Sequence, residues 1–287
     1  MSPLRRLLSS VLLLAACGLA AAAPRAALVT VLDGDAAVLR DEGRFDAAEG
    51  LALLPGDILV TSARTRLVRI EFPDGVALAL GPDTQALLQP PLPGEAVYLL
   101  TGWAKLNVPG GLAAALGVPG LEIATRGGAA VVVDQAADGL RVFAESGGAD
   151  VRTRPAGGAA QALAAGQMLS AGPGGARPEV AARPTPALVQ ALPRAFMDSL
   201  PARYAAFAGK DAPVPRPGAL AYASAQPWLD AEPALRKAFV KRWRALARDP
   251  EFRRGLVAGL KAHPEWEPVL FPPPPPHPAS TAKHRDP

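Results

Sequence analysis

The sequence predicts a mainly β fold, an antiparallel β-sandwich or jelly-roll-like domain, followed by a small α-helical C-terminal region. Short segments of alternating apolar and polar residues recur between residues 26 and 172. Turn residues separate these segments at intervals of about 8–12 residues, which is typical of sandwiches and barrels. From residue 230 onward the apolar residues recur every three or four positions, which indicates helices. No helical stretch interrupts the strands, so a parallel sheet with crossover helices is not expected.

Composition and charge divide the chain into regions. Of its 287 residues, 28 are Gly and 32 are Pro, which favours many turns and some unstructured segments. Residues 26–172 hold 10 Lys and Arg against 16 Asp and Glu, whereas residues 173–287 hold 17 against 10. This asymmetry predicts two regions with different surfaces. We expect a signal peptide at residues 1–23, a β domain at 26–172, a linker at 173–184, a helical region at 185–271 and a disordered Pro-rich tail at 272–287.

The N-terminus has the pattern of a secretory signal. Arg5 and Arg6 precede an apolar run from Leu7 to Ala16, which is shorter than the roughly 20 residues that span a bilayer. The end of this run, Leu-Ala-Ala-Cys17-Gly, resembles the bacterial lipoprotein box, in which Cys17 is the site of lipid attachment. Ordinary cleavage within residues 20–23, which discards Cys17, is the alternative. We therefore expect a periplasmic protein, anchored to the outer membrane if Cys17 is lipidated. Cys17 is the single cysteine, so no disulfide is expected.

The register of one hairpin follows from its pattern. Two apolar rows flank the turn Pro73-Asp74-Gly75; they are Val68, Ile70 and Phe72, then Val76, Leu78 and Leu80. A three-residue loop places all six side chains on one face, whereas a two-residue loop would separate them. Arg69 and Ala77 then lie on the opposite face, where we expect substitutions to be mild.

Further strands are expected on both sides of this hairpin. In chain order they are residues 28–32, 36–40, 57–61, 85–89, 97–103, 121–125, 129–134, 140–144 and 149–153. Four aspartates, Asp33, Asp35, Asp57 and Asp74, sit beside glycines in the turns between strands. We expect them to bind the backbone of their own turns, with a calcium site built from several such loops as the alternative.

Two motifs in this region resemble the FecR-like domain family. Gly50, Leu54-Pro55-Gly56-Asp57-Ile58 and Thr61 are similar to its first signature, and residues 68–84 are similar to its hairpin. Gly102 fits the turn that follows, and residues 122–125, 138–142 and 165–167 match the later half more loosely. The best-known members are periplasmic and relay a signal from an outer-membrane receptor to a sigma factor, through a transmembrane helix and a cytoplasmic segment. Only a handful of residues precede the apolar run here, so the resemblance implies the periplasmic β module alone.

Caps and apolar stripes predict the helices of the C-terminal region. Thr185, Asp230 and Asp249 are each followed within three residues by a proline suited to a first helical turn. Two apolar stripes follow; they are Leu235, Phe239, Trp243 and Leu246, then Phe252, Leu256 and Leu260.

The same helices are rich in cations. Nine Lys and Arg lie between residues 235 and 261, against Asp249 and Glu251. The cations form a solvated face, dock on the acidic β domain, or bind an anionic envelope component such as lipid headgroups, lipopolysaccharide or peptidoglycan. The residues expected to contact such an anionic surface are Arg236, Lys237, Lys241, Arg242, Arg244, Arg253 and Arg254. Nucleic acid is not an expected partner of an exported chain.

The sequence offers no catalytic or metal-binding constellation. The three histidines are His263, His277 and His284, and the last two lie in the expected tail. We expect His263 to face solvent at a helix end or to interact with the helix dipole. No Cys, His, Asp and Glu cluster has ligand spacing, and no nucleophile motif accompanies His263. We therefore expect a non-enzymatic protein without a cofactor, whose β module binds a ligand or protein partner in the periplasm. The alternative is a component of transmembrane signalling to a sigma factor, acting through another membrane protein.

Overall fold

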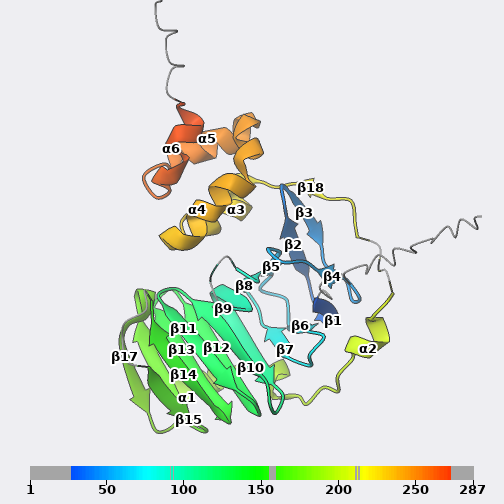
Figure 1. Cartoon of the computed structure of the whole chain (residues 1–287), viewed down its shortest axis with the longest axis vertical. Helices are drawn as coiled ribbons and strands as arrows, with labels where there is room; N and C mark the ends of the chain where they lie inside the picture. Colours follow the sequence, from blue (N-terminus) through cyan, green and yellow to red (C-terminus); the bar gives the residue numbers. More distant parts are fainter. Residues whose placement is uncertain are drawn as a thin grey trace, which may run out of the picture.

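The computed structural model describes residues 27–90, 92, 94–154, 160–210, 212 and 214–272. It confirms a mainly antiparallel β fold with helices toward the C-terminus (Figure 1). The strands of the first half are β1 Ala27–Asp33, β2 Ala36–Arg40, β3 Gly43–Asp46, β4 Ala52–Leu53, β5 Ile58–Thr61, β6 Leu67–Glu71, β7 Ala77–Leu80 and β8 Gln85–Leu88. Those that follow are β9 Val97–Val108, β10 Ala113–Val118, β11 Leu121–Arg126, β12 Ala129–Ala136, β13 Gly139–Ser146, β14 Gly148–Thr153, β15 Gln161–Ala164, β16 Met168–Gly172, β17 Ala176–Ala181 and β18 Gly218–Ala219.

These strands form two layers that share one long strand. Sheet A has the order β4-β1-β6-β7-β9-β12-β13-β16-β17, and sheet B has the order β18-β3-β2-β5-β8-β9-β10-β11-β14-β15. The first half of β9 pairs with β8 and β10 in sheet B, and its second half pairs with β7 and β12 in sheet A. Every pairing is antiparallel except that of β9 with β10.

Gly102 lies where β9 passes from one sheet to the other. Its φ is +93°, a backbone conformation that L side chains rarely adopt. A Cβ at this position would also lie 2.4 Å from Thr84 Oγ1. The turn that the resemblance placed at Gly102 is thus the crossing of a single strand between two sheets.

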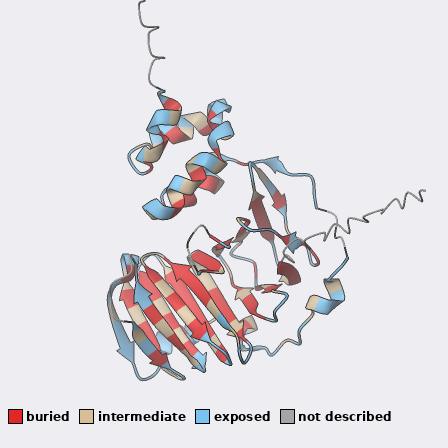
Figure 2. Cartoon of the chain, viewed as in Figure 1, coloured by how far each residue is buried: buried red, intermediate tan, exposed pale blue. Residues whose placement is uncertain are grey.

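The core fills the space between the two layers. Val29 and Ile70 of sheet A and Val38 and Leu59 of sheet B are fully buried members of one cluster. Buried and partly exposed residues alternate along the strands (Figure 2), because successive side chains point to opposite faces. Burying apolar surface contributes about 25 cal/mol per Å², so this shared core dominates the stability of the sandwich.

The predicted hairpin register is confirmed. Val68 pairs with Leu80 and Ile70 with Leu78, while Phe72 N donates to Val76 O at 2.9 Å. Gly75 has the positive φ (+92°) that the turn needs. Asp74 Oδ1 accepts a hydrogen bond from Val76 N, so this aspartate binds its own turn as expected.

Arg69 and Ala77 lie on the opposite face of the hairpin as predicted, but this face is covered, so mild substitutions are no longer expected there. Ala77 is buried and Arg69 is half-buried, because residues 192–204 cross the outer face of sheet A. This segment contains the 3-10 turn η2 (Arg194–Met197) and leads into α2 (Tyr204–Phe207). Glu71 is buried beneath it and accepts hydrogen bonds from Arg203 N and Tyr204 N. Alternation identifies the polar face of a strand but does not reveal that another segment covers it.

The segment expected to be a linker, residues 173–184, is structured. It holds the 3-10 turn η1 (Pro173–Gly175) and β17, whose Val180 pairs with Leu169 of β16 at the edge of sheet A. Pro178 and the small residues around it conceal this strand in the sequence. They suit a sheet edge, because an edge strand needs backbone N–H groups on one side only.

The short helix α1 (Pro186–Ala191) precedes the segment over sheet A. The later helical elements pack on the outer face of sheet B (Figure 1). They are α3 Tyr222–Leu229, α4 Pro233–Arg242, η3 Arg244–Arg248, α5 Pro250–Ala258, η4 Pro264–Trp266 and α6 Glu267–Leu270. Thr185 and Asp249 cap α1 and α5 as predicted, through bonds from Leu188 N and Phe252 N. Asp230 does not cap α4, whose N-cap is Glu232. No helix of the described residues is long and apolar enough to cross a membrane.

Candidate functional site

The predicted cationic site lies on helices that dock against sheet B. Leu39, Ile58, Leu87 and Tyr98 on the outer face of the sheet share one hydrophobic cluster with the helices. The helices contribute three fully buried tryptophans, Trp228, Trp243 and Trp266. Phe239 stacks on Trp243 with ring centroids 4.5 Å apart. The apolar stripes predicted for α4 and α5 thus serve to attach the helices to the sandwich, and the cations occupy what remains of the helix surface.

Arg242 faces the sandwich and is not available to an external partner. Its guanidinium donates to Leu39 O at 3.0 Å and to Gly56 O, and burial lowers its pKa. The neighbouring Trp243 donates its indole N–H to Asp41 O at 2.8 Å. Arg242 therefore satisfies backbone carbonyls at the interface between the helices and sheet B. This corrects its assignment to the anionic-surface contact.

Arg236 and Arg253 also make internal contacts. Arg236 Nε lies 2.8 Å from Glu265 Oε1, and both side chains are mostly buried. Arg253 donates to Leu270 O at 2.6 Å, which ties α5 to the end of α6. The carboxylate of Glu265 offsets the charge of Arg236 toward a distant anionic surface. Arg253 keeps its charge, but its guanidinium is engaged with a backbone carbonyl.

Four of the seven predicted residues remain in solvent. Lys237, Lys241, Arg244 and Arg254 are exposed, and within the described part of the chain none of them forms an ion pair. Arg248 at the end of η3 and Lys261 in the turn after α5, which were not assigned to the site, are exposed as well. The helical layer therefore presents six cations to solvent while its aromatic face is buried.

A buried charge cluster joins the helical layer to sheet B. Glu95, whose side chain is 1% exposed, forms an ion pair with Arg154, and Arg154 Nη2 lies 3.1 Å from Glu232 Oε1 at the start of α4. Burial raises the pKa of Glu95 to about 7, and the carboxylates of Glu122 and Glu232 add to this effect while Arg154 opposes it. The sequence gives no local signal for this cluster, because its members come from three distant segments.

His263 is buried, so it does not face solvent, and of the two expected placements the one beside the end of a helix remains. Its Nδ1 lies 3.2 Å from Asp230 Oδ1 and its Nε2 lies 3.3 Å from Leu256 O. Both ring nitrogens thus face acceptors, and the pair ties the end of α3 to α5. With Nε2 directed at a backbone carbonyl, the ring has no nitrogen left to serve as a base toward a substrate.

The remaining predicted residues divide between structural roles and segments that are not described. Asp57 is buried, pairs with Arg40 at 2.6 Å and accepts a hydrogen bond from Leu54 N. Asp33 and Asp35 form surface pairs with Arg66 and Arg64. Within the described ranges no cluster of His, Cys, Asp and Glu is arranged to hold a metal ion. Cys17 and residues 273–287 of the expected tail lie outside the described residues.

Comparison with known proteins does not identify the chain. No family model matches it, and no curated protein matches it either. Two crystal structures of a candidate anti-sigma factor from Parabacteroides distasonis ATCC 8503, at 2.50 Å and 1.65 Å resolution, are similar to it with 14% identity and a TM-score of 0.36. Each match covers 43% of this chain and 58% of the other, so the chain spans little more than half the length of that protein. An identity and a TM-score this low assign neither a family nor a function.

Proposed function

We propose that the chain is an exported, non-enzymatic cell-envelope protein. Its FecR-like β module binds a ligand or protein partner in the periplasm, and its helical layer holds the molecule against an anionic envelope component. The observation that carries this proposal is the set of exposed cations on a layer whose apolar stripe is already used in packing. Lipid attachment at Cys17 would supply a second anchor, as stable membrane association requires two signals.

The cations lie on neighbouring elements of the helical layer. Arg254 is exposed on α5, and Lys261 is exposed in the turn that follows this helix. Lys237, Lys241 and Arg244 follow the exposed side of α4 into η3. A cation near an anionic surface contributes about 1 kcal/mol, and only within a Debye length of about 8–10 Å. Six of them give weak attachment that depends on salt.

Sedimentation of the full chain with anionic phosphatidylglycerol vesicles tests this proposal. We expect binding at low salt that is mostly lost at about 0.5 M, where the Debye length falls to a few Å. A variant with Lys237, Lys241, Arg244 and Arg254 changed to Gln should lose most of the binding. The matched control changes four exposed cations elsewhere, Arg64, Arg126, Arg183 and Arg194, to Gln. Equal loss in both variants, or no sedimentation of the wild type, would refute the proposal.

The FecR-like hairpin favours a second candidate, a component of transmembrane signalling to a sigma factor through another membrane protein. Its supporting observation is that residues 68–80 form the hairpin in the predicted register. Deleting the gene for this chain in the cell that produces it, and then measuring sigma-factor-dependent transcripts, tests this candidate. Unchanged transcript levels would remove it and leave the binding function alone.

A further inference from the structure

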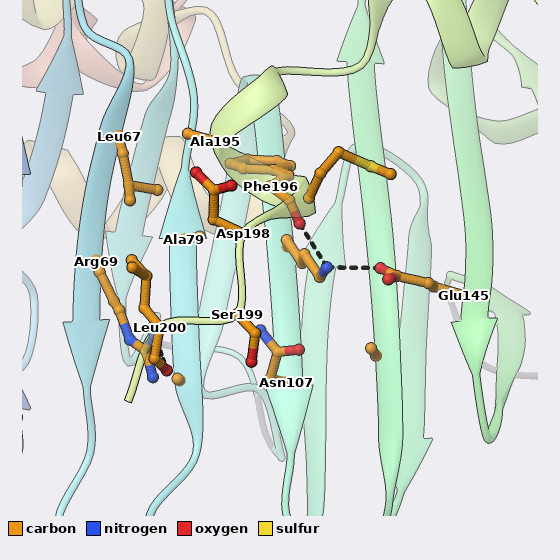
Figure 3. A pocket seen from close by; sticks show the side chains of 14 residues that line it. Leu67, Arg69, Ala79, Asn107, Glu145, Ala195, Phe196, Asp198, Ser199 and Leu200 are labelled. Carbon is orange, nitrogen blue, oxygen red and sulfur yellow. Dashed lines mark hydrogen bonds and ion pairs between the residues drawn. The ribbon is translucent and has the colours of Figure 1, made fainter. Parts of the chain in front are cut away.

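A cavity of about 380 Å³ lies on the outer face of sheet A, on the side of the sandwich away from the helical layer. Its volume falls in the range of roughly 300–1,000 Å³ that is usual for small-molecule sites. Small side chains create the hollow, because Ala77 and Ala79 of β7 and Ala130 of β12 form its floor. Residues 195–200 cross above this floor as a roof (Figure 3).

The roof is fixed to the sheet on both sides of the cavity. Lys105 Nζ donates to Phe196 O at 2.6 Å, and Arg69 Nη1 donates to Leu200 O at 2.9 Å. Phe196 itself is buried against Leu67 and Val132. Charged donors to carbonyls are among the stronger hydrogen bonds, at about 1.5–3 kcal/mol each. The roof is thus held at two points and leaves the space between them open.

Polar groups with unused hydrogen-bonding capacity line the cavity. Lys105 is buried and uses two of its three donors, on Phe196 O and on Glu145 Oε2 at 2.6 Å (Figure 3). Asn107 lies two residues further along β9, so its side chain points to the same face. Among the described residues, neither the Asn107 carboxamide nor the Ser199 hydroxyl forms a hydrogen bond. These groups are available to a ligand with both donors and acceptors.

The charges around the cavity balance. Its lining holds two cations, Arg69 and Lys105, and two carboxylates, Glu145 and Asp198. A simple anion or a simple cation would meet as much repulsion as attraction, whereas a zwitterion can place each end beside the opposite charge. A carboxamide such as that of Asn107 is a donor and an acceptor and so matches a peptide group. A neutral polyol has no charged end to place beside Lys105 or Asp198.

We propose that this cavity binds a short zwitterionic peptide, with its carboxylate near Lys105 and Asn107 and its ammonium group near Asp198. The inference rests on the proposed function, because it names the ligand class of the β module. It does not depend on the cationic face of the helices, which lies on the other side of the sandwich.

Calorimetric titration of the full chain with trialanine tests the proposal. We expect a dissociation constant of about 1 mM or tighter, equivalent to at least about 4 kcal/mol of binding free energy. N-acetyl-trialanine amide, which lacks both terminal charges, should bind at least tenfold more weakly. Glucose should not bind. No heat with trialanine, or equal binding of the capped peptide, would overturn the proposal.

Two variants locate the site. Asn107→Ala removes the free carboxamide and Ala79→Leu fills part of the floor, and each should weaken trialanine binding at least tenfold. The matched control is Ala162→Leu on the exposed surface of β15 at the edge of sheet B, which should leave binding unchanged. Far-UV circular dichroism confirms that each variant is folded. Trialanine binding that survives both cavity variants would place the ligand elsewhere and refute the site. Because vesicle sedimentation uses no peptide, its failure and the failure of this titration are distinguishable.

Discussion

Glu95 gives the structure a pH dependence that can be measured. Its carboxylate is enclosed between the sandwich and the helical layer, where Arg154 forms ion pairs with both Glu95 and Glu232. The carboxylates of Glu122 and Glu232 and the Tyr98 ring, with the Arg154 guanidinium 5.4 Å from its centroid, complete its surroundings. Gly117 leaves room for it, because a Cβ there would lie 1.8 Å from Glu95 Oε2. Burial raises the pKa of Glu95 from 4.5 to about 7 despite the single neighbouring cation.

The raised pKa sets the sign of the effect. The folded state binds a proton at Glu95 more tightly than the unfolded state does, so stability from this group is complete below pH 4.5 and is lost as pH rises toward 7. A difference of about 2.5 pKa units at about 1.4 kcal/mol each gives a loss of about 3 kcal/mol in the free energy of unfolding. Replacing Glu95 with Gln keeps the shape of the side chain and removes its charge. Glu95→Gln should therefore match the wild type near pH 4.5 and be more stable than it by up to about 3 kcal/mol at pH 8.

Urea denaturation at pH 4.5, 6 and 8 measures this difference through the unfolding midpoints of the two proteins. Glu179→Gln, a change of an exposed carboxylate on β17, is the control and should show no pH-dependent difference from the wild type. If Glu95→Gln is less stable than the wild type at every pH, the ion pair with Arg154 outweighs the cost of burial and the reasoning is wrong.

The hairpin and the N-terminus give three further predictions. Ile70→Asp should unfold the protein, because it buries an unpaired charge in the shared core. Arg69→Gln should cost about 1–3 kcal/mol of stability, because it removes the hydrogen bond to Leu200 O and the ion pair with Glu71. The control Arg66→Gln, at an exposed ion pair, should change stability by less than about 0.5 kcal/mol. Equal effects of the two substitutions in thermal unfolding would show that residues 192–204 do not cover this face. Cys17→Ala should release the protein from the membrane fraction if Cys17 carries the lipid anchor, and normal processing with unchanged fractionation would exclude lipid attachment.

The sequence alone determined much of the local structure of the sandwich. The register from Val68 to Leu80 follows from the period-2 pattern and the turn residues, because a shift by one residue would move every apolar side chain to the wrong face. The caps at Thr185 and Asp249 and the apolar stripe of α4 were also predictable, because each depends on residues within a few positions of one another. Strands with weak intrinsic preference, such as β10 with three alanines and a glycine, and β17 with Pro178, were not predictable from their own residues.

The tertiary structure decided which of the exposed-looking residues are available. Periodicity placed Arg69 and Arg242 on polar faces and the following proline placed His263 at a helix end, but neither signal shows whether a distant segment covers the residue. Residues 192–204 cover Arg69, sheet B covers Arg242, and α3 and α5 enclose His263. The cavity over Ala77 and the charge cluster at Glu95 likewise join segments far apart in the chain. Their contacts form only when the core places two sheets and a helical layer together, because packing between layers is set by long-range burial rather than by local sequence.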